Sequence, residues 1–416
     1  MVLAVAAALA VASCDATAVA GRPSTGVPSA GDRAAAAGPP SGTGAPAAPV
    51  PRTSSVVQGL HPYAGAGAGH LTGAALRAKR LVYVPNQLSG TVQVIDPTTY
   101  RVVARLPVAA SPEHVVPSWD LGRLWVNSDA GDALTPIDPS TGRPGSPVAA
   151  RDPYNLYFTP DGRSALVMAS RFRAIDVRDP RTMRLLRSVP VPMCAGVNHA
   201  DYTADLRHLL VSCEFNGRLL VLDAGATKVL QVLDLNGIRT PGATPPAHAH
   251  LMPGPKSQLV AGASAMPQDV RLTPDGRWFM VADMLRNGVW FVDAARRSVH
   301  HFVPTGLGTH GVYPSRDGRR VFVTNRDAGS VGVFDAASNS LVATWRLPGR
   351  ATPDMGGISA DGSELWLTGR YTAEVYVIDT RTGRLLHRIP TDAGPHGLLV
   401  WPQPGRFSLG HTGNTR

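Results

Sequence analysis

The sequence predicts an all-β fold, a seven-bladed β-propeller of four-stranded antiparallel blades over residues 80–416. Segments of alternating apolar residues that end in an aspartate recur at intervals of about forty residues, the period of a propeller blade. Asp-Gly pairs flanked by such segments predict tight hairpin turns. The 43 glycines, 37 prolines and 6% aromatic content are typical of short strands joined by turns rather than of long helices.

The first fourteen residues predict a signal peptide. Residues 1–13 are almost wholly apolar, which is long enough for a signal sequence but too short to span a bilayer. The run ends in Val11-Ala12-Ser13-Cys14, which resembles a bacterial lipobox. This resemblance implies cleavage before Cys14, a lipid anchor on its thiol and a position on the extracytoplasmic face of the cell membrane. One feature departs from the lipoprotein pattern, because no Lys or Arg precedes the apolar run. The alternative is an ordinary signal peptide, which would predict a secreted protein.

Residues 15–79 are predicted to form a disordered linker. The segment is dominated by Ala, Gly, Pro, Ser and Thr. Such a composition buries too little apolar surface to offset the entropy lost on ordering. We therefore expect a tether between the membrane anchor and the folded domain.

The repeats define the blades and their closure. The seven strand-ending aspartates are Asp96, Asp138, Asp176, Asp223, Asp293, Asp335 and Asp379. Asp-Gly turns follow the inner strands at Asp161-Gly162, Asp275-Gly276, Asp317-Gly318 and Asp361-Gly362. A last apolar segment near residues 395–401 is predicted to pair with Leu81–Val84, because closing the ring removes exposed sheet edges. Residues 405–416 fit no strand of the repeat.

One insertion interrupts the regular spacing. Residues 236–264 lengthen the connection between two blades and contain His248 and His250. A long loop on a rigid scaffold is often functional. The two histidines are therefore candidate ligands of a metal ion.

Two short segments carry a family resemblance. Val82-Tyr83-Val84-Pro85-Asn86 and Val321-Phe322-Val323-Thr324-Asn325 are close to the motif that names the YVTN-repeat family, also called YncE-like or lactonase-like propellers. The resemblance covers residues 80–402 and implies a seven-bladed fold. It implies little about activity, because one propeller scaffold hosts many functions.

One set of equivalent positions on the inner strands is rich in histidine. Alignment on the Asp-Gly turns places His114, His199, Asp269, His310 and His396 in one column, together with Asn155 and Gly356. Inner strands line the central channel, so we expect these side chains to converge. Imidazole is a good ligand for copper, zinc or iron, and this set predicts a copper or zinc site. The alternative is that the histidines only hydrogen-bond neighbouring blades.

The facing strands supply further candidates. Cys213, Asp283 and Asn325 occupy equivalent positions there, and we expect Asn325 opposite His310 and Cys213 near His199. Cys213 is then either a soft metal ligand or the partner of Cys194 in a disulfide, which export would permit. A carboxylate pair such as Asp269 and Asp283 is a candidate for acid–base chemistry if both are buried together.

The remaining features narrow the function classes. The net charge is +10, but the arginines are scattered, so no nucleic-acid partner is expected. The sequence lacks a P-loop, a Gly-x-Ser-x-Gly elbow, a His-Glu-x-x-His motif and a haem-attachment motif. A monomeric binding module for a small ligand or a cell-envelope protein is the first hypothesis. A copper-dependent or other transition-metal oxidoreductase is the second. A lactonase-like hydrolase is the third, although it would need a carboxylate-rich site.

Overall fold

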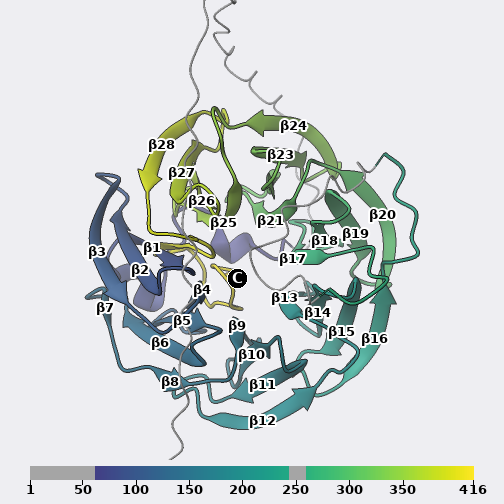
Figure 1. Cartoon of the computed structure of the whole chain (residues 1–416), viewed down its shortest axis with the longest axis horizontal. Helices are drawn as coiled ribbons and strands as arrows, with labels where there is room; N and C mark the ends of the chain where they lie inside the picture. Colours follow the sequence, from purple (N-terminus) through teal and green to yellow (C-terminus); the bar gives the residue numbers. More distant parts are fainter. Residues whose placement is uncertain (1–60, 243–258) are drawn as a thin grey trace, which may run out of the picture. The chain divides into compact units, whose positions relative to one another are not determined.

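Seven antiparallel sheets surround one central axis (Figure 1). The computed structural model describes residues 61–242 and 259–416, and Cys14, His248 and His250 lie outside these ranges. The seven-bladed fold is therefore confirmed. Within the described ranges, no helix has the length and apolar character needed to cross a membrane.

Each blade is built from consecutive strands, except the first, which borrows its inner strand from the end of the chain. From the channel outward, blade 1 is β29 (Leu399–Trp401), β1 (Leu81–Asn86), β2 (Thr91–Asp96) and β3 (Arg101–Pro107). Blade 2 is β4 (Pro112–Pro117), β5 (Leu124–Ser128), β6 (Ala133–Asp138) and β7 (Arg143–Pro144), with β8 (Val148–Ala149) also paired to β6. Blade 3 is β9 (Pro153–Phe158), β10 (Ala165–Ala169), β11 (Ala174–Arg178) and β12 (Leu185–Pro190).

The other four blades repeat the same plan. Blade 4 is β13 (Val197–Tyr202), β14 (His208–Cys213), β15 (Arg218–Asp223) and β16 (Val229–Asp234). Blade 5 is β17 (Pro267–Leu272), β18 (Trp278–Asp283), β19 (Gly288–Asp293) and β20 (Ser298–Pro304). Blade 6 is β21 (Thr309–Pro314), β22 (Arg320–Asn325), β23 (Ser330–Asp335) and β24 (Ser340–Arg346). Blade 7 is β25 (Pro353–Ile358), β26 (Glu364–Gly369), β27 (Glu374–Asp379) and β28 (Leu385–Pro390).

Six of the seven predicted aspartates end the third strand of their blade and cap the next turn. The prediction is wrong for Asp176, which lies inside β11 and pairs with Arg151, while Asp179 caps that turn. Asp379 Oδ1 accepts hydrogen bonds from the backbone N–H of Arg381 at 3.0 Å and of Thr382 at 2.8 Å. At the Asp-Gly turns, Gly162 has φ +68°, a left-handed conformation that glycine adopts without a Cβ clash. These turns fix the register in which successive strands pair.

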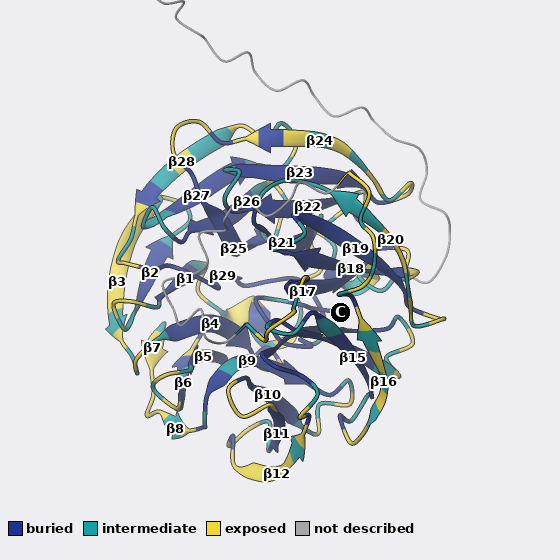
Figure 2. Ribbon diagram, turned by 45° about the vertical axis from the view of Figure 1, so that its right-hand side comes forward, coloured by how far each residue is buried: buried dark blue, intermediate teal, exposed yellow. Residues whose placement is uncertain are grey.

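The core lies between neighbouring sheets, and the inner three strands of each blade are largely buried while the outermost strands are exposed (Figure 2). Large side chains such as Trp125, Trp290 and Trp366 fill the gaps between blades. Each blade therefore depends on its neighbours for burial, as expected for a ring of repeats.

The ring closes as predicted. Leu81 pairs with Trp401, Val82 with Val400 and Tyr83 with Leu399, so β1 and β29 form one antiparallel ladder between the two ends of the folded region. The backbone edges that an open ring would expose are thus hydrogen-bonded.

The predicted linker boundary at residue 79 is wrong, because residues 61–79 pack on the propeller. They contain two short 3₁₀ helices, η1 (Ala64–Ala66) and η2 (Gly73–Arg77), whose Ala66 and Ala75 are buried. The Tyr63 hydroxyl donates a hydrogen bond to the carbonyl of Leu272 at 2.8 Å. One aromatic anchor and small buried alanines are enough to order a segment whose composition resembles a linker.

The C-terminal tail, residues 402–416, crosses the end of the channel, and Figure 1 shows the terminus near the centre of the ring. Leu409 is buried in the core between blades 3 and 4. Asp201 accepts hydrogen bonds from Asn414 Nδ2 and Arg416 Nη2, both at 2.7 Å. This tail accounts for the residues that no strand of the repeat explained.

Ring closure makes a direct prediction for truncated proteins. Deleting residues 394–416 removes β29 and the tail, which leaves β1 with a free edge and opens the core of blade 1. We expect aggregation or a large drop in melting temperature, measured by size-exclusion chromatography and circular dichroism. Deleting only residues 405–416 keeps β29 and should give a folded monomer of lower melting temperature. Equal melting temperatures for the full chain and the longer truncation would contradict the role of β29.

Candidate functional site at the channel centre

Two tiers of side chains line the channel. In each blade one inner-strand residue pairs with the end of the next strand; examples are Pro112 with Ser128, Val197 with Cys213 and Thr309 with Asn325. We call the residues that follow these inner-strand positions the first tier: Glu113, Tyr154, Asn198, Gln268, His310, Asp354 and His396. The residues after them form the second tier: His114, Asn155, His199, Asp269, Gly311, Met355 and Gly397.

The tail closes one mouth of this channel. It contacts the carboxyl ends of the inner strands: the Phe158 N–H donates to the Leu409 carbonyl and the Ser408 N–H to the Trp119 carbonyl. The first tier lies near the amino ends of the same strands, so it faces the opposite mouth.

The single column predicted from the sequence is wrong in part, because it mixes the two tiers. His114, His199 and Asp269 belong to the second tier, whereas His310 and His396 belong to the first. His310 lies one residue further from Asp317-Gly318 than His199 lies from Asp205, and Thr309 rather than His310 faces Asn325. A shift of one residue reverses the direction of a strand side chain.

The structure nevertheless brings the predicted histidines together and adds new members. Two groups of three residues have ligand atoms within 4.8 Å of one another: His114, His199 and His411, and His310, Asp354 and His396. Asp269 Oδ1 lies 3.5 Å from His411 Nε2 and 3.8 Å from His199 Nδ1. All six residues of the two groups are at most 2% exposed.

Sequence reasoning missed His411 and Asp354. His411 lies outside the repeat, so no alignment of blades could assign it to the channel. Asp354 had an available signal, because the correct register of the Asp361-Gly362 turn aligns it with Glu113.

Three histidines have Nδ1 within 2.9 Å of an oxygen. His114 Nδ1 donates to the carbonyl of Tyr154 at 2.9 Å. His310 Nδ1 lies 2.9 Å from Asp354 Oδ1, with Met355 Sδ at 3.0 Å. His396 Nδ1 lies 2.6 Å from Glu113 Oε2. The contact between His396 Nδ1 and Glu113 Oε2 lacks hydrogen-bond geometry, so within the described ranges neither nitrogen of His396 has a hydrogen-bond partner, and neither does Nε2 of His114. His114 and His310 thus have Nε2 left for a ligand, and His396 has both nitrogens left.

Asn155 orients the other two histidines differently. Its Oδ1 accepts the Leu156 N–H at 2.9 Å, which leaves its Nδ2 to donate to His199 Nδ1 at 3.2 Å and to His411 Nδ1 at 3.3 Å. Nδ1 is then an acceptor in both rings, and the ring proton is on Nε2. His199 and His411 thus present N–H donors rather than lone pairs.

Burial keeps the channel imidazoles neutral. It lowers the pKa of His114 to about 3 and that of His310 to about 4. The same loss of hydration holds the pKa values of His199, His396 and His411 well below the usual value. Neutral imidazoles are the form that binds metal ions.

The carboxyl groups differ in charge state. Burial alone would raise the pKa of Asp354, but the Arg326 guanidinium and a hydrogen bond from His310 hold it well below its usual value. Burial, with the neighbouring Asp129 as a second cause, raises the pKa of Glu113 to about 8. Asp354 is therefore the anion of the site, whereas Glu113 is mostly protonated at neutral pH and lies beside a neutral His396.

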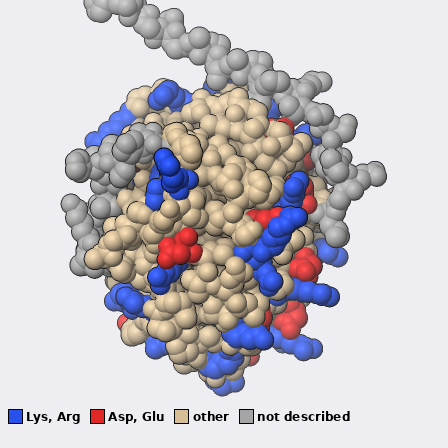
Figure 3. Space-filling model, turned by 90° about the vertical axis from the view of Figure 1, so that its right-hand side faces the viewer, with Lys and Arg blue, Asp and Glu red and all other residues tan. Residues whose placement is uncertain are grey.

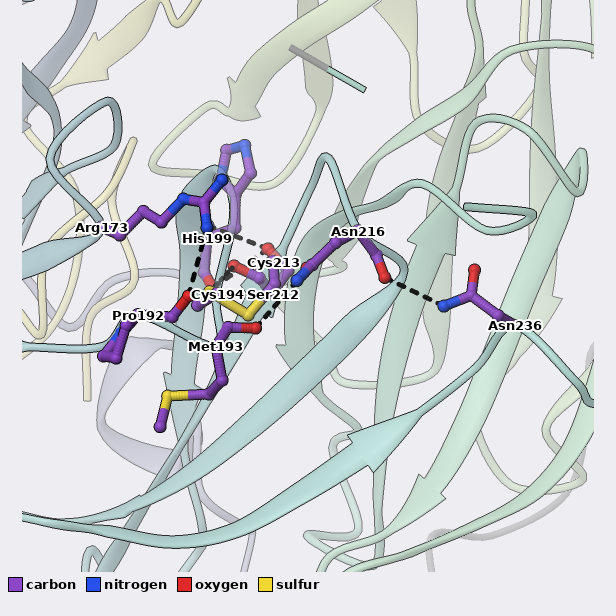
Figure 4. The surroundings of a disulfide bond; sticks show 9 residues. All are labelled: Arg173, Pro192, Met193, Cys194, His199, Ser212, Cys213, Asn216 and Asn236. Atoms are coloured by element: carbon purple, nitrogen blue, oxygen red, sulfur yellow. Dashed lines mark hydrogen bonds between the residues drawn. A yellow bond between two sulfur atoms is a disulfide. The ribbon is translucent and has the colours of Figure 1, made fainter. Parts of the chain in front are cut away.

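Other predicted candidates have structural partners. The structure joins Cys194 and Cys213 in a disulfide with an S–S distance of 2.00 Å, so Cys213 offers no thiolate (Figure 4). The Asp283 carboxylate accepts the Trp290 indole N–H at 2.8 Å and the Met266 N–H at 3.0 Å. Asn325 Oδ1 accepts the Thr305 hydroxyl at 2.8 Å.

Figure 3 shows basic and acidic side chains interspersed on the face drawn, without one continuous basic surface.

Fold and channel together define a propeller with a buried histidine-rich centre, and the sequence places it in a known family. Residues 50–181 and 258–404 match the YNCE-like beta-propeller family, and the chain belongs to it. Dihydro-heme d1 dehydrogenase from Pseudomonas aeruginosa is 24% identical over 344 residues, which cover 73% of this chain and 67% of that protein.

Solved structures agree on the fold. Hydrazine synthase from Kuenenia stuttgartiensis has a TM-score of 0.58 and 19% identity, over 79% of this chain and 100% of that chain. Dihydro-heme d1 dehydrogenase NirN in complex with DHE has a TM-score of 0.53 and 15% identity, over 77% of this chain and 74% of that chain.

The neutral imidazoles predict a pH dependence of stability, and His411→Gln should remove the part that comes from His411. The folded-state pKa of His411 is lowered, so below the unfolded-state pKa of about 6.5 the unfolded chain binds a proton that the native state does not. Stability contributed by this histidine is fully present above that pH and is lost as pH falls. We expect the unfolding free energy of wild type relative to His411→Gln to fall by about 1 kcal/mol per pH unit between pH 6.5 and 5.

Urea titrations in the presence of EDTA measure this difference. Above pH 7.5 the difference between the two proteins should be constant, because the imidazole is neutral in both states. A difference that also stays constant down to pH 5 would contradict burial of a neutral His411.

Proposed function

We propose that the protein is an exported propeller that binds one transition-metal ion, copper or zinc, at the centre of its channel. The Nε2 atoms of His114, His310 and His396 would hold the ion, with Asp354 Oδ2 as the nearby carboxylate oxygen. The observation that carries this proposal is that Nδ1 of each ring lies within 2.9 Å of an oxygen, while Nε2 of His114 and of His396 has no hydrogen-bond partner within the described ranges.

The arrangement matches the usual surroundings of a metal-binding histidine. Ligating imidazoles use their second nitrogen on a carboxylate or backbone carbonyl, which fixes the tautomer and the ring orientation. The ring centroid of His396 is 4.9 Å from that of His114 and 5.8 Å from that of His310, although His114 belongs to the other of the two groups of three whose ligand atoms lie within 4.8 Å of one another. Metal–nitrogen distances are about 2.0–2.1 Å for zinc, so the donors would move together on binding.

The negative charge of Asp354 favours a bound cation, whereas two nearby guanidinium groups oppose it. Asp354 is a buried anion whose Oδ2 has no hydrogen bond within the described ranges. The guanidinium groups of Arg326 and Arg370 lie on the same carboxylate, at 2.7 Å and 3.7 Å, and oppose a further positive charge. Under this proposal the three neutral imidazoles supply most of the binding free energy, because they bind a metal ion without first losing a proton.

A copper-dependent oxidoreductase is the second candidate, and the dehydrogenase relative favours it. Bound copper would supply one-electron chemistry, while the chain's own residues would exclude water and hold the ligand set. A tetrapyrrole like that of the relative is less compatible with this channel, because the His411 ring lies 4.7 Å from His199 and 5.1 Å from His114. The imidazole-rich donor set also argues against a lactonase-like calcium site.

Metal analysis tests the proposal. Untagged protein loaded with copper or zinc and desalted should retain about one equivalent per chain. His310→Gln combined with His396→Gln should abolish retention, and Glu113→Met should weaken affinity about tenfold by removing the carboxyl group beside His396 Nδ1. Affinity should fall as pH drops from 7 to 5, because protons compete for the imidazole lone pairs.

A matched double variant provides the control. His300→Gln with His301→Gln changes two exposed histidines on the outer strand β20 and should leave the retained metal unchanged. Undiminished metal in the His310/His396 variant, or none in wild type, would show that the channel histidines serve packing alone.

We also propose that Cys14 carries the lipid that places the propeller on the extracytoplasmic face of the membrane. The Cys194–Cys213 disulfide supports export, since such bonds persist in oxidising compartments. The full-length protein should then sediment with membranes, and Cys14→Ser should release it or block processing, because acyl chains bury many methylene groups in the bilayer. Equal soluble fractions for both proteins would refute the anchor.

A further inference from the structure

Two buried side-chain amides on adjacent blades share one carboxylate. Asn198 on β13 and Gln268 on β17 are both first-tier residues and fully buried. Asn198 Nδ2 donates to Glu214 Oε2 at 2.7 Å, and Gln268 Nε2 donates to Glu214 Oε1 at 3.2 Å. Glu214 is 5% exposed and follows β14.

This sharing fixes which way the two amides point. A carboxylate oxygen accepts hydrogen bonds and does not donate them, so each amide must turn its nitrogen toward Glu214. The carbonyl oxygens, Asn198 Oδ1 and Gln268 Oε1, are then directed away from it. In the part of the chain that the structure describes, neither oxygen has a hydrogen-bond partner. Buried acceptors almost always have a hydrogen-bond donor, so we expect these two oxygens to bind one.

The two oxygens lie across the channel from the proposed metal ligands. Around the first tier, His310, Asp354, His396 and Glu113 come from blades 6, 7, 1 and 2, whereas Asn198 and Gln268 come from blades 4 and 5. None of Asn198, Gln268 and Glu214 belongs to the proposed metal site.

From this arrangement we infer a binding site for a small primary amine in the first tier. A ligand that satisfies both carbonyl oxygens must donate at least two hydrogen bonds. An alkylammonium group offers three N–H donors, whereas an alcohol offers a single O–H. Glu214 lies directly behind the two amides and favours a positive ligand, while it disfavours carboxylates and phosphates.

Methylammonium is the simplest probe of this site. Saturation-transfer NMR and calorimetric titration of the full-length protein in EDTA should show saturable binding, and acetate and ethanol should not compete. Gln268→Met preserves side-chain size but removes the acceptor, and we expect about a tenfold loss of affinity, the effect of roughly one hydrogen bond. Glu214→Gln lets both amides rotate and should weaken binding by a similar factor.

A control separates this site from general effects on the channel. Gln93→Met removes another buried amide, but Gln93 Oε1 already accepts the Asp392 N–H at 2.7 Å, so methylammonium affinity should stay the same. Melting temperatures identify any variant that fails to fold, in which case Glu214→Gln replaces it. Absence of saturable binding, or equal affinity in wild type, Gln268→Met and Glu214→Gln, would overturn the inference and leave an ordered water as the donor. Because EDTA removes metal, failure of the metal proposal would not affect this result.

Discussion

The pairing of β29 with β1 is the constraint on which the rest of the structure depends. It brings the two ends of the folded region into one blade and removes the free edges of the ring. The same pairing fixes where the chain leaves β29, directly beside the channel. The tail then has only a short distance to cover, so His411, Asn414 and Arg416 can enter the channel end and bond to Asn155 and Asp201. The pairing of β29 with β1 therefore both closes the ring and places the tail residues in the channel.

The channel itself shows a balance between burial and polarity. Five imidazoles at its centre are neutral because burial opposes their protonation. Nearby carboxyl groups divide between Asp354, which two guanidinium groups stabilise as an anion, and Glu113, which burial keeps mostly protonated at neutral pH. Asn155 and Glu214 each fix the orientation of two partners. The result is a polar centre whose lone pairs and N–H donors have defined directions, which a purely apolar plug would not provide.

Much of this fold could be predicted from the sequence, because strands that end at or near an aspartate recur in all seven blades and Asp-Gly turns recur in four of them. Closure by the last apolar segment also followed from the need to pair free edges. The tiers were harder to predict. At Gly356 and His310 the correct register differs by one residue from a visual alignment, and a single step changes which side chain belongs to which tier. His411 could not be predicted at all, since it is placed by tertiary contacts of the tail. Residues 61–79 looked like linker because composition does not reveal the contacts of Tyr63.

The central claim is that the channel histidines form a metal site with a defined donor set. Crystals of copper- or zinc-loaded protein, with diffraction data collected on both sides of the absorption edge of the metal, test it most directly. The account predicts one anomalous peak at the channel centre, about 2.0–2.1 Å from Nε2 of His114, His310 and His396 in the zinc form. A channel that contains only water, or a peak bound by His199 and His411 through their Nε2 atoms instead, would contradict it.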